Sequence, residues 1–178
     1  KYENALYHFK RAHHLLKTDI ELSNHPIQGE LFYYIALVLE KQGQLNLALA
    51  LLRRAQTIEE RNFDNKHPNI ARIICLRGYI ESQLGLDGQK DIEKSIFLIE
   101  ELYGYKPSPD SAIAHMKYGL HFLVSKKLEE AEKWLVHAHN LNLKIYGNAH
   151  PAIIDSYYYI GWVYMAKKEF EKALEHFN

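Results

Sequence analysis

The chain has 178 residues, and its 22 Lys and Arg residues balance 22 Asp and Glu residues to a formal net charge of zero. Proteins that bind nucleic acids or anionic membrane surfaces usually carry a basic excess, so neither class is expected. Apolar residues make up 47% and charged residues 25%, which is typical of a folded globular protein rather than a disordered one. No apolar run approaches the roughly 18 residues of a membrane-spanning helix. The single cysteine, Cys75, cannot form an internal disulfide, which favours a reducing compartment, and we expect a cytoplasmic protein.

Residues 1–24 are predicted to form the second helix of a hairpin whose first helix is not in the sequence. Their apolar and small residues have the spacing found at the chain's end. They are Tyr2, Ala5 and Phe9, matching Phe170, Ala173 and Phe177. Because the sequence begins and ends within a hairpin, we interpret it as a fragment of a longer helical array.

The segment 25–66 is predicted to form a complete hairpin, with helices over about 27–42 and 45–62. Gly43 separates them, because glycine adopts the positive φ angle that reverses the chain after a helix.

The segment 67–107 is predicted to form a second, irregular hairpin. Its first helix carries Arg77 and Glu81 at positions where the other hairpins carry apolar residues. Four residues apart on a helix, these two side chains can pair. The pair is interpreted either as a partly solvated ion pair or as a buried polar contact that sets register or meets a ligand. The turn Gly85–Gly88 is shorter than its equivalents, so packing is expected to be least regular here.

The last two segments repeat the pattern. Residues 108–149 are predicted to form helices over 110–125 and 128–146, and residues 150–178 an incomplete hairpin. In that hairpin one helix runs from Pro151 to about residue 166, the turn covers 167–169, and a second helix begins at Phe170. Proline suits the first position of a helix because its φ angle is already helical and its missing N–H would have no partner.

Four dipeptides mark the start of the first helix in each hairpin, at steps of 42, 41 and 42 residues: His25-Pro26, His67-Pro68, Ser108-Pro109 and His150-Pro151. Eleven residues after each marker stands a small residue: Ala36, Gly78, Gly119 and Gly161. Small residues allow two helix backbones to approach closely. A hairpin cannot bury its apolar faces alone and needs copies stacked beside it. The sequence therefore predicts an all-α single array over 1–178 with about nine antiparallel helices, and the alternative is an ordinary helical bundle without repeats.

These residues resemble the tetratricopeptide repeat family. Its signature in the second helix is Ala-x-x-x-Phe/Leu-x-x-Ala, which occurs here as Ala5/Phe9/Ala12, Ala48/Leu52/Ala55 and Ala131/Leu135/Ala138. The unit of about 42 residues, the His-Pro marker and a preceding Tyr-Gly resemble the kinesin light chain subfamily. HEAT repeats have a similar period but lack this alanine spacing, so they rank second.

The resemblance implies a right-handed superhelix whose first helices line a concave groove that binds peptides or segments of partner proteins. Kinesin light chains usually carry paired asparagines in each first helix. The corresponding positions here are Tyr33-Tyr34, Cys75-Leu76, Met116-Lys117 and Tyr158-Tyr159. We therefore do not expect this chain to bind a peptide backbone through asparagine side-chain amides.

Two positions one turn apart lie on the face of each first helix that is turned away from the second helix. They are Tyr33/Leu37, Cys75/Tyr79, Met116/Leu120 and Tyr158/Trp162, with Glu30, Arg72 and Asp155 along the rim. This strip is interpreted as an apolar groove that receives a peptide. The alternative is that neighbouring first helices pack on it as core. In the groove interpretation Trp162 and Tyr79 contribute most to binding, and truncating either to Ala weakens a ligand by roughly 2 kcal/mol while leaving the fold intact.

No catalytic chemistry is indicated. The eleven histidines include no His-Glu-x-x-His motif, no glycine-rich phosphate loop occurs, and no neighbouring group activates Cys75. We therefore expect no enzyme activity, no cofactor and no metal, and interpret the chain as a protein-interaction scaffold. One alternative is a regulatory array that binds a signalling peptide or an effector domain of its own protein, and another is a structural array that self-assembles.

Overall fold

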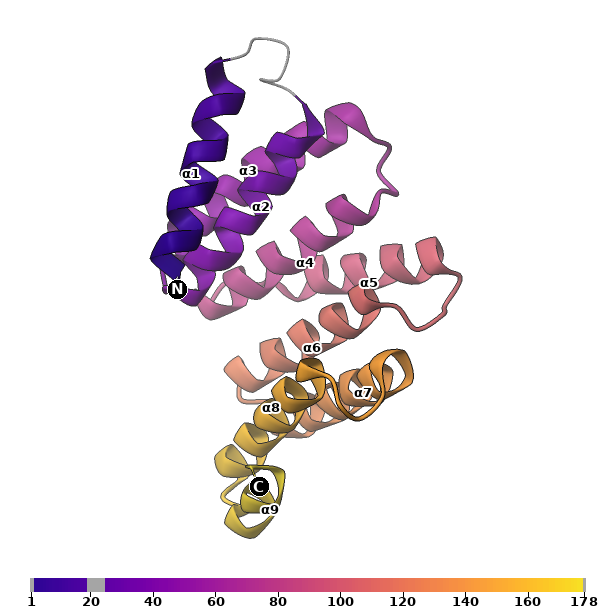
Figure 1. The fold of residues 1–178 in the computed structure, drawn as a ribbon. Helices are drawn as coiled ribbons and strands as arrows, with labels where there is room; N and C mark the ends of the chain where they lie inside the picture. Colours follow the sequence, from indigo (N-terminus) through magenta and orange to yellow (C-terminus); the bar gives the residue numbers. More distant parts are fainter. Residues whose placement is uncertain (1, 19–24, 178) are drawn as a thin grey trace.

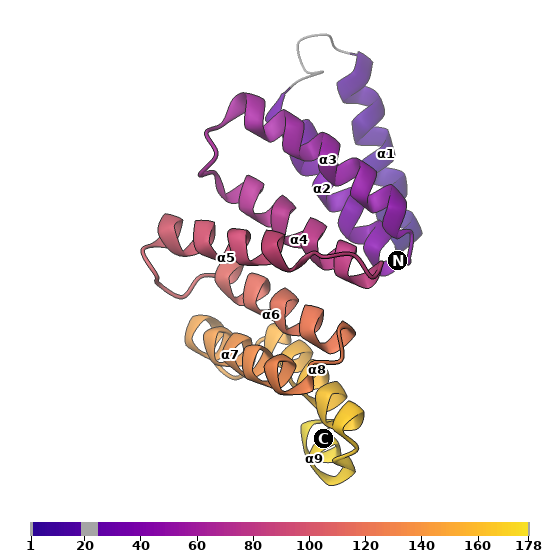
Figure 2. The same cartoon turned by 180° about the vertical axis from the view of Figure 1, so that it is seen from behind.

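The computed structural model describes residues 2–18 and 25–177, and within these ranges the chain forms nine α-helices and no strand. The all-α prediction is confirmed. Antiparallel hairpins follow one another along a curved, elongated stack, from α1 at one end to α9 at the other (Figures 1 and 2). The helices are α1 (Tyr2–Thr18), α2 (Pro26–Lys41), α3 (Leu45–Asn62), α4 (Pro68–Gln83), α5 (Gln89–Tyr103), α6 (Pro109–Val124), α7 (Leu128–Tyr146), α8 (Pro151–Lys167) and α9 (Phe170–Phe177).

The observed bounds of α2, α3, α6, α7 and α8 agree with the predicted ones to within one or two residues, and α9 begins at Phe170 as predicted. Of the helix predicted within 1–24, the structure describes Tyr2–Thr18 as helical, and residues 19–24 lie outside the described residues. No helix in the described ranges is both long and apolar enough to cross a membrane.

The His-Pro dipeptides begin helices for a reason visible in the hydrogen bonds. His25, His67 and His150 each have extended backbone angles, and each ring Nδ1 accepts a hydrogen bond from the backbone N–H two residues on, at 3.2–3.3 Å. This satisfies one of the N–H groups that a helix start leaves without a partner. Ser108 does the same for α6 through a reciprocal pair of bonds with Ser111.

The predicted small residues lie where helix backbones approach. A Cβ atom on Gly119 would lie 2.7 Å from Leu135 Cγ in α7, and one on Gly161 would lie 2.5 Å from the Phe177 ring in α9. Between α4 and α5 the approach is closer still, since a Cβ on Gly88 would lie only 1.8 Å from the carbonyl oxygen of Gly78. The short turn 84–88 therefore brings two backbones into direct contact, and both residues of that contact must be glycine.

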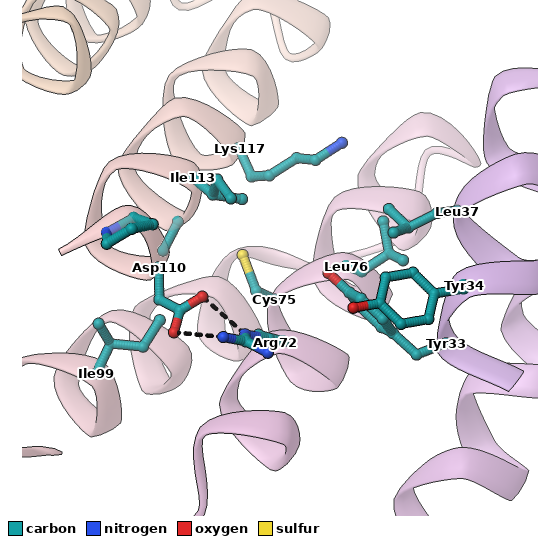
Figure 3. A pocket seen from close by; sticks show the side chains of 12 residues that line it. Tyr33, Tyr34, Leu37, Arg72, Cys75, Leu76, Ile99, Asp110, Ile113 and Lys117 are labelled. Atoms are coloured by element: carbon teal, nitrogen blue, oxygen red, sulfur yellow. Dashed lines mark hydrogen bonds and ion pairs between the residues drawn. The ribbon is translucent and has the colours of Figure 1, made fainter. Parts of the chain in front are cut away.

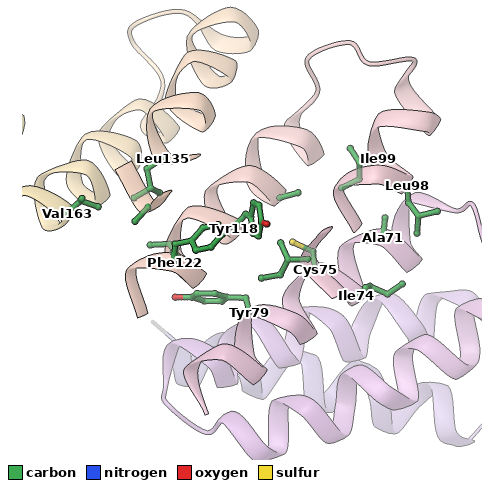
Figure 4. Packing of buried hydrophobic residues seen from close by; sticks show 14 of the residues in the cluster. Ala71, Ile74, Cys75, Tyr79, Leu98, Ile99, Tyr118, Phe122, Leu135 and Val163 are labelled. Carbon is green, nitrogen blue, oxygen red and sulfur yellow. The ribbon is translucent and has the colours of Figure 1, made fainter. Parts of the chain in front are cut away.

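The buried side chains form two clusters that meet at α4. One cluster fills the space between α2, α3 and one side of α4, including Ile73 and Ile80. The other joins the opposite side of α4 to α5, α6, α7 and α8, and Figure 4 shows Tyr79 of α4 facing Tyr118 and Phe122 of α6 within it. Because α4 is buried on both sides, it is the central helix of the array.

The predicted pairing of Arg77 with Glu81 is wrong. The Arg77 guanidinium donates to Asp91 Oδ2 at the start of α5, with Nε at 2.6 Å, and also to the side-chain oxygen of Gln56 in α3. Arg77 and Asp91 are both only about one-fifth exposed, so the contact joins α3, α4 and α5 at a junction between hairpins. Arg77 and Glu81 could pair on an isolated helix, but in the array the Arg77 guanidinium binds the carboxylate of Asp91 on the neighbouring helix instead.

Candidate functional site

The first helices of the hairpins form the inner wall of the curve. In the described part of the chain α2 contacts α4, α4 contacts α6, and α6 contacts α8, whereas α3, α5 and α7 do not contact one another. In a curved stack the helices on the inside of the curve are close together and those on the outside are spread apart. The first helices, which contact one another from repeat to repeat, therefore lie on the inside. The groove predicted from the sequence therefore corresponds to the face formed by α2, α4, α6 and α8.

A pocket of about 320 Å³ opens in this wall between α2, α4 and α6 (Figure 3). Four of the ten residues predicted for the groove line it. The lining residues are Tyr33, Tyr34, Leu37, Arg72, Cys75, Leu76, Ile99, Pro109, Asp110, Ile113, Ala114 and Lys117. Most of these side chains are apolar, so the pocket has the apolar walls and few polar groups typical of ligand sites.

An ion pair closes one end of the pocket. Arg72 of α4 donates to both carboxylate oxygens of Asp110 at the start of α6, with Nε at 2.7 Å and Nη2 at 3.0 Å, and the Tyr103 hydroxyl donates to the same carboxylate at 2.7 Å. The hydrogen bond to Asp110 raises the pKa of Arg72 above its usual range. The guanidinium therefore stays charged and holds α4 against α6.

A buried lysine lies on the α6 side of the same pocket. The Lys117 ammonium is 4.0 Å from the centre of the Tyr79 ring and 3.9 Å from Glu40 Oε2 of α2. Lys41 approaches the same carboxylate at 3.4 Å, and Gln83 donates to its other oxygen at 3.1 Å. Burial lowers the pKa of Lys117 to about 8, against the opposing effect of Glu40.

The cysteine at the floor of the pocket is a thiol rather than a thiolate. Cys75 is buried, and burial raises its pKa to about 11 although Lys117 lies near enough to oppose the shift. A thiol with this pKa is a weak nucleophile at neutral pH. Tyr33 on the opposite wall has a raised pKa for the same reason and stays protonated.

In the middle of the array the predicted strip is largely core. Tyr79 is 9% exposed and Leu120 is 5% exposed, because α4 and α6 pack directly on these side chains. Met116 is half-buried against the same cluster. In the groove interpretation Tyr79 offers its ring to a ligand with no effect on the fold, but little of that ring is uncovered, as in the alternative that neighbouring first helices pack on the strip as core. Truncation of Tyr79 is therefore expected to destabilise the fold.

At the C-terminal end of the array the strip is open. Tyr158 is 50% exposed and Trp162 is 48% exposed, and their rings meet edge to face with centroids 6.2 Å apart. Asp155 is exposed one turn earlier on α8. At the other end Glu30 of α2 accepts a hydrogen bond from the Asn69 side chain of α4 at 3.2 Å.

Several residues in or beside the pocket were not predicted from the sequence. Tyr34 and Lys117 directly follow Tyr33 and Met116 in the sequence. Only the first residue of each pair was predicted to face the groove, so Tyr34 and Lys117 were left out. Glu40 lies near the end of α2, and nothing in its local sequence indicates that it meets α6. Kinesin light chains carry paired asparagines at the positions that include Met116-Lys117 here. Had both positions of each such pair been taken as candidates for the inner wall, Lys117 would have been among them.

Three buried histidines make hydrogen bonds within the array. His121 is 2.6 Å from the Ser82 hydroxyl, His139 is 2.8 Å from the Ser156 hydroxyl, and His115 is 2.8 Å from the Ser111 carbonyl oxygen. Among the described residues no group of three or more His, Cys, Asp or Glu side chains is placed to hold a metal ion.

This arrangement of stacked hairpins with first helices inside defines a helical-repeat solenoid. Residues 110–178 match the family model described as tetratricopeptide repeat. This part of the chain is therefore similar to the tetratricopeptide repeat family.

Similar proteins were found by sequence and by structure. The chain is 27% identical over 145 residues to a protein of Lodderomyces elongisporus described as a clustered mitochondria protein homolog, and the match covers 76% of this chain. It spans only 10% of that relative's length. BtubC (BKLC) from P. vanneervenii has a similar fold, with a TM-score of 0.73 and 17% identity over 94% of this chain and 70% of its own.

A second solved structure, from Podosopora anserina and described as putative kinesin light chain nearly identical TPR-like repeats, has a TM-score of 0.59 and 15% identity over 98% of this chain and 82% of its own. At these identities the two structures show the shared fold alone.

Proposed function

We propose that this chain is a protein-interaction module that binds a peptide segment of a partner protein along the inner wall formed by α2, α4, α6 and α8. The observation that carries the proposal is the apolar pocket of about 320 Å³ in that wall, whose volume is within the range of ligand sites. Tetratricopeptide repeat folds generally mediate protein–protein interaction, which agrees with such a role.

The exposed aromatic residues of α8 extend the proposed site beyond the pocket. Tyr158 and Trp162 present large rings that lose little conformational freedom on binding, and such residues dominate the energetics of many interfaces. A peptide that fills the pocket with one apolar side chain and lies against Trp162 with another would use both surfaces.

The test starts with a random peptide library displayed on phage, selected against the chain and followed by calorimetric titration of the selected peptides. Leu37→Ala removes an apolar wall of the pocket and Trp162→Ala removes the exposed ring. Each variant is expected to weaken binding by about 2 kcal/mol, or about 30-fold.

The matched control is Phe97→Ala in α5, because Phe97 is 54% exposed on a second helix, away from the inner wall. Its binding is expected to equal that of the parent. Selected peptides that lose affinity with Phe97→Ala but keep it with Leu37→Ala and Trp162→Ala would place the binding surface on the outer helices and refute the proposal.

A further inference from the structure

Lys117 is the most unusual polar side chain in the pocket. Its side chain is only 8% exposed, and it makes no hydrogen bond within the described part of the chain. Its two partners are the Tyr79 ring and the Glu40 carboxylate, and the latter is 3.9 Å away, beyond hydrogen-bond distance. A buried ammonium with unused donors is poorly compensated for the water it has lost.

The space beside this amine is apolar and open to a small molecule. Lys117 extends from α6 across the pocket toward the α2 side, where Leu37 lies, as Figure 3 shows. Ile113 and Ala114 on α6 and Leu76 on α4 form the rest of the nearby wall. At about 30 Å³ per water molecule, a volume of 320 Å³ corresponds to about ten waters. An alkyl chain of moderate length fits such a space and is favoured there over water.

The charged groups around Lys117 decide its protonation. Glu40 of α2 favours the ammonium, Lys41 beside it opposes the ammonium, and Cys75 and Tyr79 of α4 are neutral. Burial outweighs the attraction of Glu40 and lowers the pKa of Lys117 to about 8. At pH 7.5 about a quarter of such an amine is neutral, compared with about a thousandth of an ordinary lysine.

We propose that Lys117 is a site of covalent capture for uncharged aliphatic aldehydes, which it holds as an imine with the alkyl chain in the pocket. Nothing in the repeat architecture requires a lysine here, since the equivalent positions are Tyr34, Leu76 and Tyr159. The proposal does not depend on a peptide partner, because the amine and the cavity are both present in the chain alone.

The reaction needs no oxidant or reductant. The neutral amine attacks the carbonyl carbon, an N–C bond forms as the C=O π pair moves to oxygen, and one proton passes from nitrogen to oxygen to give a carbinolamine. The C–O bond then breaks, and the oxygen leaves as water with the second amine hydrogen, so that a C=N bond remains. Glu40 Oε2 lies 3.9 Å from the Lys117 nitrogen, too far for direct proton transfer, so solvent water carries the proton from nitrogen to oxygen. Cys75 does not compete, because its thiol stays protonated.

The test uses hexanal with sodium cyanoborohydride, which reduces the imine to a stable secondary amine, followed by peptide mass mapping of the whole chain. At pH 7.5 Lys117 is expected to be labelled at least about tenfold faster than the exposed Lys94 of α5. The rate at Lys117 should level off above about pH 8. A Lys117 rate equal to or below that of Lys94 would overturn the proposal.

Two comparisons separate pocket capture from mere exposure of an amine. Glyoxylate carries a charge that the apolar walls disfavour, so the preference for Lys117 over Lys94 should fall several-fold with this aldehyde. Ile113→Trp fills the pocket and should slow labelling at Lys117 by about tenfold, while Phe97→Trp on α5 leaves it unchanged. A preference for Lys117 that survives Ile113→Trp, in a variant with the parent's circular dichroism, would show that the cavity has no part in the reaction.

Discussion

The middle of the inner wall and its C-terminal end are built from equivalent positions of the repeat, but the side chains are buried in the middle and exposed at the end. Cys75, Tyr79 and Leu120 of α4 and α6 are buried, whereas Tyr158 and Trp162 of α8 are about half exposed. The difference follows from packing, since α4 and α6 contact each other extensively and α6 and α8 only slightly. Periodicity therefore specifies which face turns inward, and the local curvature decides whether that face becomes core or surface.

The largest effect is expected at the glycine contact in the middle of the array. Gly88→Ala would place a Cβ atom 1.8 Å from the Gly78 carbonyl oxygen, and a backbone cannot move aside as a side chain can. We expect a loss of about 4 kcal/mol in the free energy of unfolding, measured by urea denaturation.

Its counterpart at the end of the array is Gly161→Ala, which meets the half-exposed ring of Phe177 in the short helix α9. That ring can rotate outward, so the loss should be about 1 kcal/mol. Equal losses for the two variants would mean that the middle and the end are equally tightly packed.

The second effect distinguishes a buried aromatic side chain of the strip, Tyr79, from an exposed one, Trp162. Tyr79→Ala leaves a cavity between α4 and α6, and we expect a loss of about 3 kcal/mol in the free energy of unfolding. Trp162→Ala should lose less than about 1 kcal/mol, because the ring is half exposed in the folded chain. Urea midpoints compared at a common slope check this, and a larger loss for Trp162→Ala would reverse the assignment of core and surface.

The third effect compares a buried carboxylate on α6, Asp110, with an exposed one on α8, Asp155. Asp110→Asn breaks the bidentate contact with Arg72 and leaves a partly exposed guanidinium, and we expect a loss of about 2 kcal/mol. Asp155→Asn alters an exposed carboxylate on α8 and should change the free energy of unfolding by less than about 0.5 kcal/mol. Thermal unfolding monitored by circular dichroism separates the two, and an unchanged midpoint for Asp110→Asn would show that the ion pair does not join α4 to α6.

The smallest effect depends on pH. Burial lowers the pKa values of His115, His121, His137 and His139, so the unfolded chain takes up protons at these positions before the folded chain does. The free energy of unfolding should therefore fall as the pH drops below about 6.5 and continue to fall until the lowered pKa values are passed.

All four histidines lie on α6 and α7, so hydrogen exchange in acid should increase there before it increases in α2 and α3. His121→Gln should reduce the acid sensitivity of α6. Uniform loosening of the whole array in acid would contradict this account.

Short sequence motifs were sufficient to predict where the first helices begin. Each His-Pro dipeptide predicts a helix start because its ring and its proline act within two residues, and the structure agrees at Pro26, Pro68 and Pro151. The small residues were also predictable, since Gly119 and Gly161 follow their markers at a fixed distance and meet the second helix of their own hairpin.

The pocket could be predicted only in part. Tyr33, Leu37, Arg72 and Cys75 line it as the face periodicity implies. The contacts of Arg72 with Asp110 and of Lys117 with Glu40 join residues from different hairpins, and their partners depend on the superhelical step. The rotation and translation from one hairpin to the next cannot be read from a single sequence. Neither these contacts nor the burial of Tyr79 could therefore be derived from it.

The ring stacks that precede the helix starts also have a mechanical consequence. Phe63 lies parallel to the His67 ring with centroids 3.8 Å apart, and Tyr146 lies parallel to His150 at 3.9 Å, while the Tyr103 hydroxyl donates to Asp110 between α5 and α6. Each of the three joints between α3 and α8 therefore has a contact of its own. Under tension along the stack, the hairpins should separate one after another, each at its own threshold force, so that the array lengthens in discrete steps.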